Sequence, residues 1–115
     1  MPNTWIIEKS DTHVLVTRRK PVRWDVSAVS EFPACHPLRL AHQIRQDMWR
    51  MLQSMRGYSP VVRLTERGQG WHVLAGGRVQ GNVPPGTVER ISDLLENQTK
   101  RGRWVAQAKR AVDKK

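Results

Sequence analysis

Two clusters of basic side chains in this sequence each end at a tryptophan. Lys and Arg can neutralise phosphates, and an adjacent indole can stack on an unpaired base. The candidate nucleic-acid-binding residues are Arg18, Arg19, Lys20, Arg23, Trp24, Lys100, Arg101, Arg103 and Trp104. DNA or RNA is therefore a candidate partner.

The net charge of +10 is concentrated in the same two segments. Residues 18–23 hold four basic and no acidic residues, and residues 100–115 hold seven basic residues against Asp113. The remaining chain is balanced, with nine basic and nine acidic residues. Clustered like charge raises the local potential and attracts polyanions.

The charge pattern favours a small basic binding module that contacts nucleic-acid phosphates. The alternative is a non-catalytic interaction subunit that binds an acidic protein surface or a second copy of this chain, because such partners use the same charge. A solvated tail that only aids solubility would also carry this charge.

Cys35, His36 and His42 are ligand types for zinc within eight residues. A structural zinc site needs four ligands, and no second Cys or His cluster completes the set. Cys35 precedes a predicted helix, a position that can activate a thiol, but no Asn or Asp partner is identifiable. No glycine-rich loop leads into a phosphate-binding helix. We expect no catalytic residue, no metal and no cofactor.

The length of 115 residues suits one domain. A single cysteine excludes an intramolecular disulfide and fits a reducing compartment. The first residues do not resemble a secretory signal, and the apolar runs are too short to cross a bilayer. The basic end of the chain has only a weak apolar face for a membrane surface. We therefore expect a cytoplasmic protein without membrane contact.

The secondary-structure pattern predicts two β-hairpins, at residues 5–18 and 61–75, with an extra strand near 78–80. Apolar residues at spacings of three and four predict a long helix over 38–56, which Pro37 begins and Gly57 ends. Residues 27–37 are predicted to be a loop. A further helix is expected from Thr87, with Gly102 as an interruption before the last helical stretch.

This order predicts an α+β fold, with a small antiparallel sheet and helices on one face. Residues 1–108 should form the single domain, and residues 109–115 a basic, flexible tail. The predicted helix 38–56 should pack on the sheet. Its inward residues are expected to be Ala41, Ile44, Met48, Leu52 and Met55, against Val62, Leu64 and Val73 of the second hairpin.

Overall fold

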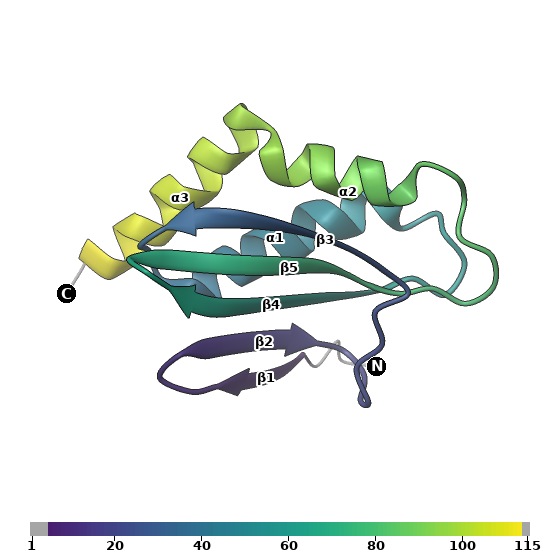
Figure 1. The fold of residues 1–115 in the computed structure, drawn as a ribbon, viewed down its shortest axis with the longest axis horizontal. Coiled ribbons are helices and arrows are strands. Elements are labelled where there is room, and N and C mark those ends of the chain that lie inside the picture. Colours follow the sequence, from purple (N-terminus) through teal and green to yellow (C-terminus); the bar gives the residue numbers. More distant parts are fainter. Residues whose placement is uncertain (1–4, 114–115) are drawn as a thin grey trace.

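The computed structural model describes residues 5–113, with side chains as far as Lys109. It shows a five-stranded antiparallel sheet with three helices packed on it (Figure 1), which confirms the predicted α+β class. The elements in chain order are β1 (Ile6–Lys9), β2 (His13–Thr17), β3 (Val26–Pro33), α1 (Pro37–Leu52), β4 (Ser59–Arg67), β5 (Gly70–Arg78), α2 (Thr87–Glu96) and α3 (Gln98–Asp113).

Both predicted hairpins are present. β1 pairs with β2 from Ile6 opposite Thr17, and β4 pairs with β5 across a two-residue loop. The sheet order is β1-β2-β4-β5-β3, so β2 and β3 follow each other in the chain but lie on opposite sides of the β4–β5 hairpin. Residues 18–25 must therefore pass the ends of β4 and β5.

The fifth strand was predicted in the wrong place. Most of the predicted loop 27–37 belongs to β3, which pairs with β5 along its whole length, whereas β5 ends at Arg78 and no separate strand occupies 78–80. The Gly76-Gly77 pair, which resembles a break in the pattern, lies within β5 between two neighbouring strands. A Cβ on Gly76 would lie 2.0 Å from the carbonyl oxygen of Val26, so only glycine permits this close backbone approach.

The helices also differ in their ends from the sequence prediction. α1 begins at Pro37 as expected but ends at Leu52, and residues 53–57 form turns before β4. The C-terminal helices divide at Asn97, while Gly102 lies inside α3 and interrupts nothing. Asn97 favours this division because its side-chain oxygen accepts a hydrogen bond from the Lys100 N–H at 3.0 Å, which caps the start of α3.

The core lies between the helices and one face of the sheet. Along β4, Val62 and Leu64 are fully buried while the intervening Arg63 is exposed, the alternation of a sheet covered on one side. The predicted stripe of α1 is buried at Ala41, Ile44, Met48 and Leu52, and Met55 is half-buried beyond the end of the helix.

The predicted tail is only partly described. The backbone of α3 is helical to Asp113, while the side chains from Arg110 and residues 114–115 lie outside the described part, so the flexibility of 109–115 stays a prediction. None of the helices in residues 5–113 is both long enough and apolar enough to span a membrane.

Candidate anion-binding site

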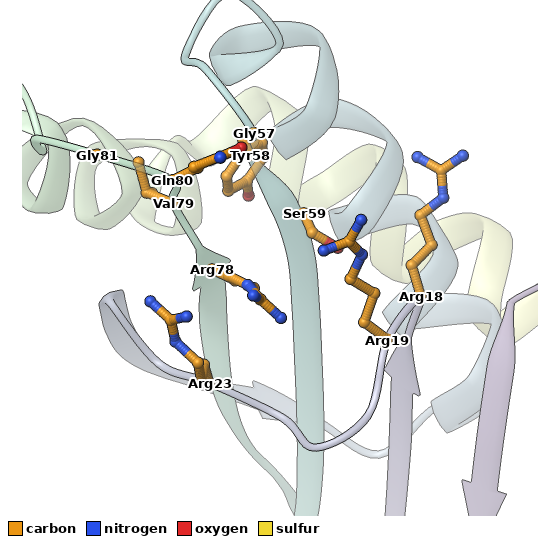
Figure 2. Close-up of a pocket in the computed structure, with 10 residues that line it drawn as sticks. All are labelled: Arg18, Arg19, Arg23, Gly57, Tyr58, Ser59, Arg78, Val79, Gln80 and Gly81. Carbon is orange, nitrogen blue, oxygen red and sulfur yellow. The ribbon is translucent and has the colours of Figure 1, made fainter.

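The connection from β2 to β3 brings three arginines to one end of the sheet. Because residues 18–25 pass the ends of β4 and β5, they carry Arg18, Arg19 and Arg23 to the point where β5 ends at Arg78. Figure 2 shows Arg19 and Arg78 extending toward each other across this end, with Arg23 on one side of this pair and Arg18 on the other.

These four arginines line a hollow of about 710 Å³, which we call the arginine hollow. The rest of its wall is Gly57, Tyr58 and Ser59 from the turn before β4, and Val79, Gln80 and Gly81 from the segment after β5. No aspartate or glutamate is among these ten residues. The wall therefore presents positive side chains and backbone groups to any ligand that enters.

Gly57 permits the two loop segments of the wall to meet. Its φ is +66°, and a Cβ on it would lie 2.4 Å from the Cβ of Gln80. A side chain at position 57 would be strained by the backbone conformation and would also push this segment away. The N–H of Gln80 donates to the carbonyl of Arg56 at 3.2 Å and holds the segments together.

Tyr58 forms a rigid, buried part of the wall. Its hydroxyl donates to the carbonyl of Gly76 at 3.0 Å, and its ring stacks on Trp49 with centroids 6.2 Å apart. Burial raises the pKa of the Tyr58 hydroxyl far above its ordinary value, so it remains neutral. The residue supports the hollow and adds no charge to it.

One carboxylate positions the hollow from outside its wall. Asp25 accepts the N–H of Val79 and a guanidinium N–H of Arg23, each at 2.8 Å. The bond from Val79 is the largest cause of the lowered pKa of Asp25, which burial partly opposes and Arg23 reinforces. Asp25 therefore stays charged, and it fixes both the start of β3 and the direction of Arg23.

The arginines differ in how far they are already neutralised. Arg23 is paired with Asp25, and Lys20, next to the hollow in sequence, is paired with Glu8. Among the described residues, no ion pair or side-chain hydrogen bond engages the guanidinium of Arg19 or Arg78. These two groups are therefore the strongest candidates to receive an anion.

Trp24 lies at the outer face of the sheet and does not line the arginine hollow. It is half-buried, and the guanidinium of Arg63 lies 5.7 Å from its ring centre. One part of the ring is thus engaged by Arg63. Base stacking on Trp24 stays a prediction.

The second basic cluster has a different environment. The guanidinium of Arg101 donates to Ser30 Oγ at 2.8 Å and to the carbonyls of Leu95 and Glu31 at 2.9 and 2.7 Å, and it lies 4.0 Å from the ring centre of Phe32. These contacts join α3 to β3 and to the end of α2. Arg101 is therefore positioned as a structural residue.

Trp104 and Arg103 attach α3 to α1 through the buried Asp47. The Asp47 carboxylate accepts the indole N–H of Trp104 at 2.8 Å and a guanidinium N–H of Arg103. Trp104 is 0% exposed, so no ring face is open to a base, contrary to the predicted role in stacking. A carboxylate on the facing helix explains this burial, because it satisfies the only polar group of the indole.

Lys100 is half-buried beside a hollow of about 360 Å³ between α1, α2 and α3. Neither it nor Arg101 nor Arg103 lines the arginine hollow. Figure 1 places the beginning of α3 on the far side of β3 from the loop that follows β2. Residues 18–23 and the beginning of α3 therefore lie apart in the fold.

Cys35 and His36 have structural roles, and His42 accepts the Nε–H of Arg45 at its Nδ1. His36 caps α1 by accepting the Arg39 N–H at 3.3 Å, and Cys35 is buried, which raises the pKa of its thiol and works against nucleophilic activation. Within residues 5–113, no three His, Cys, Asp or Glu side chains are grouped as metal ligands.

Sequence reasoning missed Arg78, the fourth arginine of the hollow. It follows Arg19 by almost sixty residues and carries no motif of its own. Only the pairing of Ser59 with Arg78, together with the crossing of residues 18–25, brings it to the others. A correct strand order would have been needed to find it.

The sequence matches no protein-family model, and no match was found among curated proteins or among solved structures. The function is therefore inferred from the chain's own residues.

Proposed function

We propose that this protein binds nucleic acid by its phosphate backbone, through Arg18, Arg19, Arg23 and Arg78. The observation that supports this most is that four arginines line one hollow, with no aspartate or glutamate among its ten lining residues. Guanidinium groups bind phosphate through two parallel hydrogen bonds and stay charged at all physiological pH values. A polymer of phosphates offers such anions at close spacing.

The rival partner is an acidic protein surface. It would bind the same arginines, so the same protein variants would weaken both kinds of binding. Only a change of ligand can distinguish the two partners. Polyglutamate with the same number of charges as the oligonucleotide is the appropriate competitor, because it carries carboxylates in place of phosphates.

The test is the salt dependence of oligonucleotide binding, followed by fluorescence anisotropy. Contacts by Arg19 and Arg78 alone predict a slope of log K against log salt of about −1.8 for a duplex and about −1.4 for a single strand, and contacts by all four arginines predict about −3.6 and about −2.8. The double variant Arg19→Gln/Arg78→Gln removes two contacts and should flatten the single-strand slope by about 1.4.

Arg67→Gln is the matched control, since it removes one exposed arginine at the opposite end of β4, roughly 26 Å away along the strand. No binding at about 50 mM salt, or equal loss with the control, would refute the proposal. Stronger binding of polyglutamate than of the oligonucleotide would instead support an acidic protein partner.

A further inference from the structure

A second basic hollow lies along the first half of α1. It has a volume of about 560 Å³ and is lined by His36, Leu38, Arg39, His42, Gln43, Arg45 and Gln46. It too has no aspartate or glutamate in its wall, and the first turn of α1 contains no acidic residue. We call it the α1 hollow.

Trp5 joins the two hollows. The guanidinium of Arg18, from the arginine hollow, lies 5.4 Å from the Trp5 ring centre. The guanidinium of Arg45, from the α1 hollow, lies 4.4 Å from the same centre. The two cations therefore lie no farther apart than the sum of these distances, so a single tryptophan ring contacts one guanidinium from each hollow.

The basic groups of the α1 hollow lie close enough to influence one another. The pKa of His42 is lowered, first by burial and then by the charges of Arg45 and Arg39. The pKa of Arg45 is lowered by burial and by Arg18. With its pKa lowered, His42 is neutral near pH 7 and its Nδ1 accepts the Nε–H of Arg45 at 3.2 Å, so Arg39 and Arg45 supply the positive charge that an anion would meet in this hollow.

We propose that the arginine hollow, Trp5 and the α1 hollow form one continuous track for a single-stranded nucleic acid. This inference rests on the proposed function and specifies its ligand. The track passes from the end of the sheet to the side of a helix, and each end is a hollow. A duplex is stiff over about 150 base pairs and cannot follow such a path, whereas a single strand can bend along it and stack its bases on guanidinium planes.

The track predicts a dependence on strand length. Single strands of increasing length should bind more tightly until one strand reaches both hollows, and further nucleotides should add little. The double variant Arg39→Gln/Arg45→Gln should bind the shortest strands as the unmodified protein does, but lose the gain with length. Its single-strand salt slope for long strands should be flatter by about 1.4, which corresponds to two contacts.

The single variant Arg39→Gln should fold normally even if the double variant does not, because the Arg39 side chain is exposed and makes no hydrogen bond or ion pair to the described residues. It should flatten the slope by about 0.7, whereas the control Arg67→Gln should not flatten it.

The outcomes separate the two proposals. If no strand of any length binds the unmodified protein, the proposed function fails, and the track with it. If strands bind through Arg19 and Arg78 but both α1 variants show the unmodified length dependence, the track is refuted and the arginine hollow stands alone. Tighter binding of a duplex than of either of its strands, at equal salt, would also overturn the track.

Discussion

Replacing Arg101 with Met tests whether the second basic cluster is structural. The variant keeps an unbranched side chain against Phe32 but removes the guanidinium and its three hydrogen bonds, to Ser30 Oγ and to the carbonyls of Leu95 and Glu31. It therefore separates loss of these bonds from loss of packing.

The expected cost follows from the number of bonds and the partial exposure of the side chain. A hydrogen bond contributes about 0.5–1.5 kcal/mol, and more when one group is charged, while solvent screening reduces the charged contribution. Three bonds therefore predict a loss of about 2–4 kcal/mol in the free energy of unfolding. With a urea dependence of about 2 kcal/mol per molar, the unfolding midpoint should fall by roughly 1–2 M.

The assay is urea unfolding followed by circular dichroism, combined with oligonucleotide binding at a urea-free condition where the variant is folded. Lys109→Met is the matched control, because it removes one exposed positive charge from the same helix. It should change the unfolding free energy by less than about 0.5 kcal/mol.

Two results would refute the structural assignment of Arg101. One is an unfolding free energy within about 0.5 kcal/mol of the unmodified protein. The other is a flatter salt slope for the folded variant, since that would place Arg101 on the phosphate-binding surface.

Two further predictions concern α1. Leu52→Ala should lower the unfolding free energy by roughly 2–5 kcal/mol in urea titrations, because the side chain is fully buried in the core, and a loss below about 0.5 kcal/mol would show that the helix does not pack as described. The lowered pKa of His42 means that the unfolded chain takes up a proton at higher pH than the folded chain does. Stability should therefore fall as pH decreases below about 6.5, and His42→Gln should make that fall shallower; identical pH profiles of the two proteins would contradict this.

The sequence predicted the elements that local pattern determines. The spacing of Ala41, Ile44, Met48 and Leu52 is enough to identify a helix and its buried side, and Pro37 marks its start. The hairpins are equally local, since β-rich runs flank short turns.

β3 could not be predicted in the same way. Its sequence is Val-Ser-Ala-Val-Ser-Glu-Phe-Pro, in which small residues and serines replace the usual alternation of large apolar and polar side chains. It forms a strand because it pairs with β5, whose backbone can approach it closely at Gly76, where no side chain intervenes. The stabilising contact comes from a segment about fifty residues later in the chain.

The candidate site was predicted only in part, because it too depends on contacts between residues far apart in the sequence. The sequence identified Arg18, Arg19 and Arg23 as basic neighbours, but their fourth member, Arg78, depends on strand order. It also could not distinguish Trp24 from Trp104, because both follow basic residues. What differs is the partner: Asp47, more than fifty residues away, receives the Trp104 indole N–H inside the protein.

A basic side chain in this protein therefore indicates function only once its hydrogen-bond and ion-pair partners within the fold are known. Arg101 and Arg103 are as basic as Arg19 and Arg78, yet their guanidinium N–H groups already donate hydrogen bonds to oxygen atoms of β3 and α1. A phosphate would have to displace those bonds, and the gain of new contacts would be offset by the loss of the old ones. At Arg19 and Arg78 no such bond to the described residues is lost, although the charge of Arg78 also interacts with the nearby Asp25 carboxylate. This difference favours a structural role for Arg101 and Arg103, and it favours the loop between β2 and β3 for the proposed binding.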